Sequence, residues 1–252
     1  MLRNWVVHTY FTQGYYDKGL QFITSFRKFH DTPILASTRS LSADERWELL
    51  RIPRVIVSDH HLNVHDMTHQ TGKNLAVLHD YEKSVINREP PGDNLLWKLY
   101  ISVKDRYRRS IEEVLNLGHN VLHFDADTVV KRSLDPLFKM AYRHDICIKF
   151  KNYQCSQGQV LGSLISFQNN LAVAKFTRTW FDIIDSVKVH EMPRGFGQKS
   201  FYSAYLKTRD SVNFGRIPDS FIKRGRRPPR HKGKLPKSNF SGWKSDYIDK
   251  IK

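Results

Sequence analysis

The chain is poor in cysteine and has no long apolar run. Its 252 residues include only Cys147 and Cys155, so no disulfide framework is indicated and a reducing compartment is the simpler expectation. No segment approaches the ~20 consecutive apolar residues that span a bilayer. Residues 1–8 are too short and too polar to contain the apolar region of a signal peptide. We therefore expect a soluble, cytoplasmic protein with no signal peptide and no membrane anchor.

Three common catalytic signatures are also missing. The sequence contains no Gly-x-Gly-x-x-Gly fingerprint, no Gly-Lys-Ser/Thr phosphate loop and no Gly-x-Ser-x-Gly elbow. These motifs shape the backbone around a dinucleotide, a triphosphate and a nucleophilic serine, respectively. Their absence argues against a dinucleotide oxidoreductase, a P-loop ATPase and a serine hydrolase of the α/β type.

Basic residues are in large excess. The 41 Lys and Arg residues against 25 Asp and Glu give a formal net charge of +16, which favours an anionic partner: nucleic acid, a membrane surface or a phosphorylated small molecule. Hydrophobic residues make up 40% and aromatic residues 12%, enough for a sizeable core. Because the chain has no internal repeat and no linker, we expect one large α/β domain over residues 1–252.

Segments of strand-like and helix-like periodicity alternate along the chain. Strands are predicted at 5–11, 34–36, 54–59, 145–150, 160–167 and 212–217, together with a strand that follows Gly118 and carries the Asp-x-Asp pair. Helices are predicted at 19–29, 42–50, 100–117, 133–138, 171–187 and 200–206. Ser42 with Glu45 forms a capping box, and Gly118 is placed to end a helix. The alternation predicts a mainly parallel sheet flanked by helices.

The most informative segment runs from His119 to Val130, where an apolar stretch leads into Asp125 and Asp127. A strand alternates its side chains, so we expect both acids to point the same way. Two carboxylates held close together repel each other unless a cation lies between them. Hard oxygen ligands suit magnesium or manganese. The alternative interpretation is a strand that ends in a polar turn.

Other polar residues are expected at the same edge of the sheet. Tyr10 and Thr12 end the first predicted strand, and Asp59 ends the third. Ligands of open parallel sheets bind at the carboxyl ends of the strands, so these ends together predict a nucleotide site. The alternative for Thr12 and Asp59 is simple capping of a helix or turn.

Two polar segments lie outside this pattern. Residues 223–237 are basic and contain His231 and Lys234, which could ligate a metal and neutralise phosphate; the alternatives are a solvated tail or an electrostatic nucleic-acid contact. Histidines 61, 65 and 69 are spaced four apart, but with no His-Glu-x-x-His motif and no apolar stripe we favour a polar loop over a zinc site.

Taken together, these features resemble the GT-A-type nucleotide-sugar glycosyltransferases. The stretch from Leu117 to Leu137 is similar to their glycine, apolar run, Asp-x-Asp, apolar run and Asp-Pro-Leu. Gln198 resembles the glutamine of their Asp-Gln pair, and His231-x-Gly-Lys234 resembles their C-terminal element. The resemblance implies a GT-A-like α/β fold with a mainly parallel central sheet. It also implies a Rossmann-like nucleotide-binding half at 1–130, an acceptor half at 131–222 and a basic segment at 223–252 that closes over the donor.

The resemblance further implies a metal-dependent sugar transfer. The donor is a nucleoside-diphosphate sugar, with UDP as the default, the acceptor is a hydroxyl of an oligosaccharide or glycan, and the cofactor is Mn²⁺ or Mg²⁺. The metal ligands implied are Asp125, Asp127 and His231. The nucleotide-contacting residues are expected to be Thr9, Tyr10, Thr12, Asp59, Lys98, Asp125, Ala126 and Lys234.

The residues on the sugar side are less defined. Gln198 is expected to contact the sugar or else to cap the next helix, and Gly197 stands where the family often has aspartate. An inverting transferase needs a general base, for which Glu191, Asp219 and Asp145 are the candidates. The retaining or inverting outcome, and transfer of a hexose or a pentose, stay open.

Two alternatives remain beside sugar transfer. One is a basic nucleic-acid-binding protein or a metal-dependent nuclease that uses Asp125 and Asp127. A nuclease usually needs further carboxylates, and a single-stranded substrate favours aromatic residues among the basic ones; here Phe221, Phe240 and Trp243 only loosely flank the basic run. The other is a nucleotide-sugar fold that binds without catalysis, against which the intact Asp-x-Asp argues.

Overall fold

A computed structural model describes residues 4–39, 41–60, 110–150, 160–187, 196–218 and 221. All of them belong to one compact unit, Met1–Ile222. The strands are β1 (Trp5–Thr12), β2 (Ile34–Arg39), β3 (Val55–His60), β4 (Asn120–Asp125), β5 (Ile146–Phe150), β6 (Val160–Phe167) and β7 (Phe214–Arg216). The helices are α1 (Tyr16–Arg27), α2 (Ala43–Leu50), α6 (Ser110–Asn116), α7 (Asp135–Ala141), α8 (Leu171–Asp185) and α9 (Phe196–Thr208), with a 3₁₀ turn η1 (Gln13–Tyr15) before α1.

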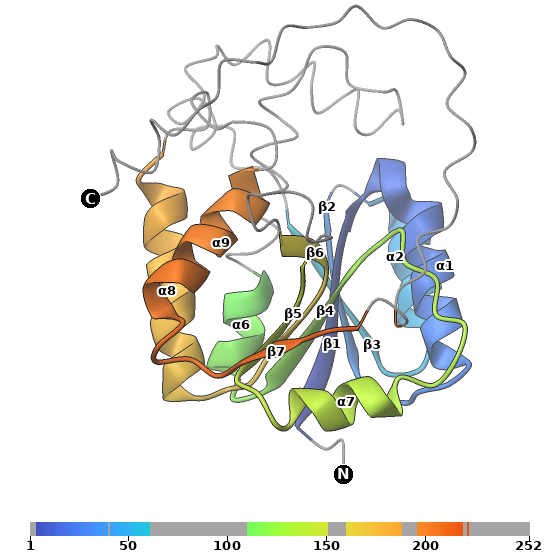
Figure 1. The fold of residues 1–252 in the computed structure, drawn as a ribbon. Helices are drawn as coiled ribbons and strands as arrows, with labels where there is room; N and C mark the ends of the chain where they lie inside the picture. Colours follow the sequence, from blue (N-terminus) through green and yellow to red (C-terminus); the bar gives the residue numbers. More distant parts are fainter. Residues whose placement is uncertain are drawn as a thin grey trace, which may run out of the picture. The chain divides into compact units, whose positions relative to one another are not determined.

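The strands form one sheet in the order β3-β2-β1-β4-β6-β5-β7 (Figure 1). Strands β3, β2, β1 and β4 pair in parallel, and β7 pairs in parallel with β5. Strand β6 runs antiparallel to both of its neighbours, β4 and β5. The prediction of an α/β fold with a mainly parallel central sheet is therefore confirmed, whereas the reversed direction of β6 was not expected.

Helices cover both faces of the sheet, and strand alternation divides the core accordingly. On one face, Val7 of β1 belongs to a cluster with Phe22 of α1 and Leu137 of α7. On the other face, Val121 of β4 packs in a cluster built from side chains of α6, α8 and α9, among them Trp180. Figure 1 shows α8 and α9 on the side of the sheet opposite to α1. The central strands β1 and β4 are buried from both sides.

Two helix ends form as the sequence predicts. The Ser42 hydroxyl accepts a hydrogen bond from the Glu45 N–H at 3.2 Å, and the Glu45 carboxylate accepts one from the Ser42 N–H at 2.9 Å. This is the predicted capping box of α2. Gly118 follows α6 with φ of +81°, a conformation that favours glycine because it has no Cβ.

Several boundaries differ from the predicted ones. Strand β2 extends to Arg39, since its backbone pairs with β1 on one side and β3 on the other although residues 37–39 are polar. Helix α9 begins at Phe196, four residues early, and therefore includes Gln198. Of the helix expected at 100–117, the structure describes Ser110–Asn116. Over the described ranges, no helix has the length and apolar character needed to cross a bilayer.

Candidate active site

The strand order places a switch point between β1 and β4. From β1 the chain proceeds to β2 and then β3 on one side, and β4 lies on the other side of β1 (Figure 1). Open α/β sheets bind their ligands at such a point, outside the carboxyl ends of the strands. Tyr10 of β1 is in register with Asp125 of β4. The structure thus brings together Tyr10, two residues before the end of β1, and Asp125, the last residue of β4.

The face shared by Tyr10 and Asp125 changes from apolar to polar along the strands. In-register residues of parallel strands share a face, and the residues that alternate onto this one are Val6, His8 and Tyr10 on β1, Val121, His123 and Asp125 on β4, and Leu35, Ser37 and Arg39 on β2. Helix α6 packs its Ile111 and Val114 in the cluster that contains the apolar members. Most of the polar half is buried, including His8, Ser37 and His123, whereas Asp125 at the end of β4 is half-buried. A ligand site on this face therefore lies at its outer edge, around Asp125.

The acidic pair lies on a turn rather than along a strand. Strand β4 ends at Asp125, and the Thr128 N–H donates to the Asp125 carbonyl at 3.0 Å, which closes a β-turn. Asp125 is half-buried and Asp127 is exposed. The expectation that strand alternation sets the direction of Asp127 was therefore wrong, because the strand stops two residues earlier.

The carboxylates of this turn fit a hard divalent cation. Magnesium is commonly held by one or two protein carboxylates, with water and substrate phosphates completing the shell. Asp125 and Asp127 supply two oxygen donors at a sheet edge. Within the described residues, no group of three His, Cys, Asp or Glu side chains is close enough to hold a metal. Further ligands would have to come from a bound sugar-nucleotide substrate, from water or from other parts of the chain.

The loop behind the acidic turn is held by Ser25 of α1 and by His30, which follows that helix. The Val130 N–H donates to the Ser25 hydroxyl at 3.0 Å, and the Leu134 N–H donates to His30 Nε2 at 2.7 Å. Figure 1 shows this loop passing along α1 between β4 and α7. One contact from α1 and one from the residues just after it therefore fix the segment that follows Asp127.

The His30 contact makes the stability of this segment depend on pH. Burial lowers the pKa of His30 below its ordinary value, although Asp135 acts in the opposite direction. Because the unfolded chain then binds the proton more readily, the stabilisation is complete above an unfolded pKa of about 6.5 and declines as the pH falls through it toward the folded pKa. We expect His30→Gln, whose amide oxygen can still accept from Leu134, to flatten the loss of unfolding free energy between roughly pH 7 and pH 5. Urea denaturation at several pH values in this range measures the unfolding free energy. The prediction is contradicted if this free energy depends on pH as steeply in the variant as in the wild type.

Other predicted nucleotide residues are placed differently. Thr9 is fully buried and alternates onto the opposite face, toward the cluster that contains Val7. Thr12 is half-buried at the end of β1, and its side chain makes no capping hydrogen bond. Ala126 is buried within the acidic turn. The backbone of Asp59 pairs with Thr38 in the sheet, two strands away from β1.

Gln198 reaches the same end of the sheet by another route. It lines a small crevice together with Val160, Gly162 and Ile165 of β6. Since β6 is antiparallel to β4, with Leu164 opposite Phe124, the beginning of β6 lies at the carboxyl end of β4. The structure therefore brings Gln198 to the edge that carries the acidic turn. The expected site residues Lys98, Glu191, Asp219, His231 and Lys234 lie outside the described residues, as does the histidine segment at 61–69.

Comparison with known proteins identifies the architecture. No protein-family model and no curated protein matches the chain. The structure is similar to the glycosyltransferase GlyE of Streptococcus pneumoniae TIGR4, with a TM-score of 0.53 and 11% identity over 86% of this chain and 46% of that one. It is also similar to an active-site mutant of LgtC, with a TM-score of 0.50 and 11% identity over 89% of this chain and 80% of that one. The chain has the GT-A glycosyltransferase fold. It spans less than half of the GlyE chain.

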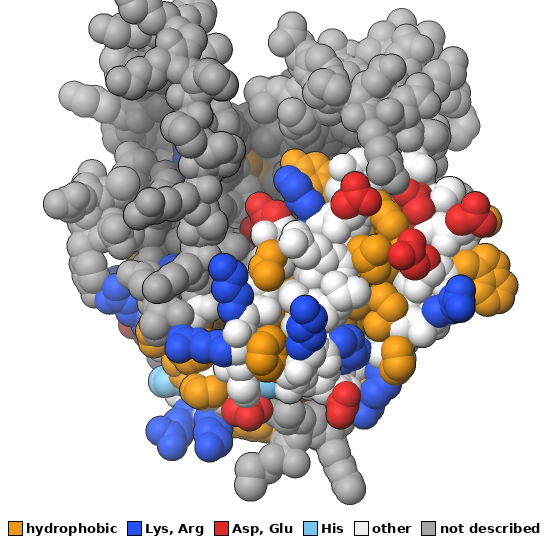
Figure 2. All heavy atoms as spheres, turned by 90° about the vertical axis from the view of Figure 1, so that its right-hand side faces the viewer, with side chains coloured by type: hydrophobic (Ala, Val, Ile, Leu, Met, Phe, Trp, Pro, Cys, Tyr) orange, Lys and Arg blue, Asp and Glu red, His pale blue; other side chains and the backbone are white. Residues whose placement is uncertain are grey.

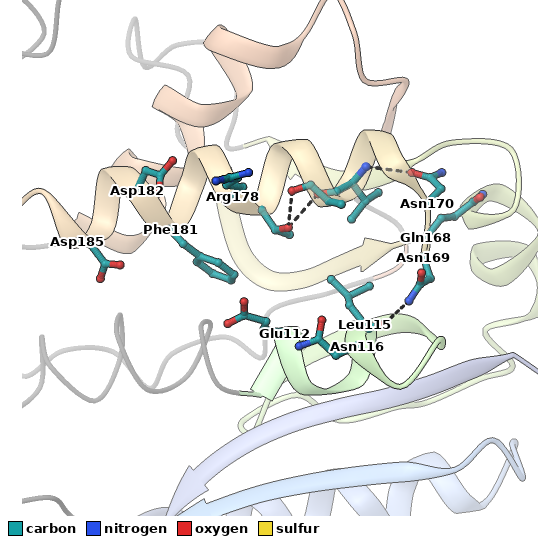
Figure 3. Close-up of a pocket in the computed structure, with 13 residues that line it drawn as sticks. Glu112, Leu115, Asn116, Gln168, Asn169, Asn170, Arg178, Phe181, Asp182 and Asp185 are labelled. Atoms are coloured by element: carbon teal, nitrogen blue, oxygen red, sulfur yellow. Dashed lines mark hydrogen bonds between the residues drawn. The ribbon is translucent and has the colours of Figure 1, made fainter.

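This structure also has an open groove away from the acidic turn. The groove, of about 410 Å³, lies between α6 and α8, and Figure 3 shows Asp182 and Asp185 toward one end and Asn169 and Asn170 at the other. The amides already serve the fold: Asn170 caps α8 through the Val173 N–H, and Asn169 donates to the Leu115 carbonyl. None of the expected site residues that the structure describes lines it, so we place the active site at the sheet edge instead.

The polar half of the GT-A sheet also contains residues that sequence reasoning missed. Arg39 is buried at the end of β2, in register with Thr12, and Lys149 is buried on β5. His8, Ser37 and His123 lie on the face of Tyr10. Their signal was available in the sequence, since polar residues recur at every second position toward the ends of β1, β2 and β4.

The surface formed by α1 and α2, across the sheet from α8 and α9, carries charges of both signs. Figure 2 shows basic and acidic side chains intermingled over the described surface around α1 and α2, where Trp47 and Leu50 are exposed. Nucleic-acid phosphate backbones favour a continuous basic patch or stripe. This face therefore gives no support to the nucleic-acid alternative.

Proposed function

We propose that the protein is a metal-dependent glycosyltransferase. It transfers a sugar from a nucleoside-diphosphate sugar, UDP-sugar by default, to a hydroxyl of an oligosaccharide or glycan. The proposal is carried by one observation: Tyr10 and the Asp125–Thr128 turn meet in register at the switch point of the sheet. The GT-A fold supports it, because the solved structures of similar fold are glycosyltransferases.

Each residue of the edge has a role in this proposal. Asp125 and Asp127 hold Mn²⁺ or Mg²⁺, and Tyr10 contacts the nucleoside at the end of β1. When bound, the metal stabilises the charge that develops on the nucleoside diphosphate as the sugar bond breaks. Gln198 approaches the donor sugar from α9. Tyr10, Asp125 and Gln198 lie on β1, β4 and α9, which gives their positions rigidity, and Asp127 lies on the turn that follows β4.

The remaining roles rest on the resemblance alone. His231 is proposed to complete the metal shell, and Lys234 to neutralise the diphosphate. Lys98 is proposed to contact the nucleotide. The segment 223–252 contains eleven basic and two acidic residues, more than half of the net charge of +16, which suits an anionic donor. Replacing Lys234 by Gln then weakens UDP binding without weakening that of uridine.

Of the three candidates for the general base, Asp145 has a structural role in the fold. Asp145 precedes β5 at the opposite end of the sheet from Asp125. Its two carboxylate oxygens accept hydrogen bonds from the Asn170 amide at 2.7 Å and the Asn213 N–H at 2.8 Å. Asp145 is therefore a structural carboxylate, and Glu191 and Asp219 stay as the candidates.

A thermal-unfolding screen tests the proposed function. The protein is mixed with UDP, GDP or single-stranded DNA, each with and without manganese. Because a ligand that binds only the native state raises its stability, we expect a manganese-dependent rise in melting temperature with a nucleoside diphosphate. A rise with DNA alone that disappears at higher salt supports the nucleic-acid alternative instead.

A further inference from the structure

Three polar side chains are joined across the middle of the sheet. His8 of β1 and His123 of β4 are both fully buried, and their Nδ1 atoms lie 2.8 Å apart. The two rings are stacked, with centroids 5.0 Å apart and an interplanar angle of 26°. His8 Nε2 lies 3.2 Å from the hydroxyl oxygen of Ser37 on β2. Side-chain hydrogen bonds therefore link β2, β1 and β4 in addition to their backbone pairing.

The chemistry of imidazole makes this chain of contacts specific. A neutral imidazole has one N–H and one acceptor nitrogen, so a single hydrogen lies between the two Nδ1 atoms. If His8 donates it, His8 Nε2 accepts the Ser37 hydroxyl hydrogen. If His123 donates it, His8 Nε2–H donates to Ser37 instead. Both arrangements satisfy the two ring nitrogens of His8, and removal of a partner leaves a buried polar atom of this chain of contacts without it.

The network lies directly beneath the proposed donor site. His8 is two residues before Tyr10, and His123 is two residues before Asp125, on the same face of the same strands. Ser37 is in register with Tyr10. Two residues along a strand correspond to roughly 6.6 Å, one layer of side chains. The layer that supports the nucleoside and metal groups is therefore tied sideways by the histidine pair.

We propose that the His8–His123 pair, anchored by Ser37, is a positioning element that sets the spacing between the nucleoside-binding end of β1 and the metal-binding end of β4. This inference rests on the proposed function. A donor that is bound through its base at Tyr10 and through its diphosphate and metal at Asp125 contacts both strands at once. A buried polar pair adds little net stability over apolar side chains of the same shape, so its effect is on geometry more than on folding.

Two isosteric variants of His8 separate the two links. An asparagine amide lies as many bonds from Cα as Nδ1, and a glutamine amide as many as Nε2. His8→Asn therefore keeps the link to His123, and His8→Gln keeps only the link to Ser37. We expect His8→Gln to raise the Kd for UDP with manganese by roughly tenfold to a hundredfold and His8→Asn to leave it near the wild-type value. Isothermal titration calorimetry measures both.

Uridine without metal serves as the second readout, because it contacts the β1 side alone. We expect its binding, followed by ligand-observed NMR, to be unchanged in His8→Gln. A purely structural role weakens uridine and UDP alike, which overturns the inference, as does wild-type affinity of His8→Gln for UDP with manganese. Ser166→Ala, which removes a buried hydrogen bond between β6 and β5 at 3.1 Å, is the matched control and keeps both affinities.

A fully apolar pair provides a test if the single variants fold poorly. His8→Leu combined with His123→Leu is expected to keep a melting temperature near that of the wild type and still to lose UDP affinity by the same factor. Wild-type UDP affinity in this folded double variant overturns the inference. If the wild-type protein itself binds no UDP with manganese, the proposed function fails first, and the two failures are thereby distinguished.

Discussion

Asp127→Ala is expected to abolish manganese-dependent turnover of the donor while leaving the fold intact. Asp127 is exposed on the turn after β4, and a substitution at such a surface position usually changes stability by at most ~0.5 kcal/mol. Loss of a group that stabilises the transition-state charge lowers kcat by roughly 10²- to 10³-fold or more. Donor hydrolysis, followed by release of the nucleoside diphosphate, measures the effect.

The control for this substitution is Asp182→Ala. Asp182 is also an exposed carboxylate, but it lines the groove between α6 and α8, so we expect full activity. Turnover at the wild-type rate in Asp127→Ala contradicts the metal site. If Asp182→Ala is inactive and Asp127→Ala is active, the active site lies in the groove and not at the sheet edge.

Of the substitutions proposed for this protein, Trp180→Ala is expected to produce the largest loss of unfolding free energy. The indole is fully buried and contacts the rings of Phe167, Phe176, Phe181 and Phe201 at centroid distances of 4.9–6.5 Å. Its Nε1–H donates to the Ser200 hydroxyl at 3.0 Å. Truncation of such a side chain costs about 3–5 kcal/mol, since the cavity closes only in part. Denaturant unfolding followed by circular dichroism measures the free energy.

Ser200→Ala separates the packing from the hydrogen bond. It removes only the acceptor of the indole N–H, for which we expect a loss of about 1–3 kcal/mol. Trp180 of α8 packs against α9, the helix that positions Gln198. We therefore expect Trp180→Ala also to increase the mobility of α9 beside the site. A loss below about 1 kcal/mol in Trp180→Ala contradicts the role of the aromatic cluster as a core.

Much of the fold was predictable because local signals agreed with the global arrangement. The capping box at Ser42 and the glycine at 118 fixed two helix ends through contacts within a few residues. The direction of β6 was not predictable, since no local pattern distinguishes a parallel from an antiparallel partner. The extension of β2 to Arg39 was missed because backbone pairing on both sides overrides the turn-like composition of residues 37–39.

The candidate site was predictable in its chemistry more than in its geometry. The rule that parallel strands end at one edge brought Tyr10 and Asp125 together correctly. Thr9, expected only from the resemblance, lies on the other face of β1, and strand alternation does not set the direction of Asp127, which lies beyond the end of β4. The His8–His123 contact joins residues 115 apart in sequence, a pairing that follows only from the register of the two strands.

That separation has a consequence for how the molecule reaches its native state. The pairing of β1 with β4 closes a loop of more than a hundred residues, and loop-closure entropy makes such long-range pairing slow. During synthesis, β1 cannot pair with β4 until residues 120–125 have been made. The edge that carries Tyr10 and Asp125 is consequently among the last features to form, and fragments that stop before residue 120 lack it altogether.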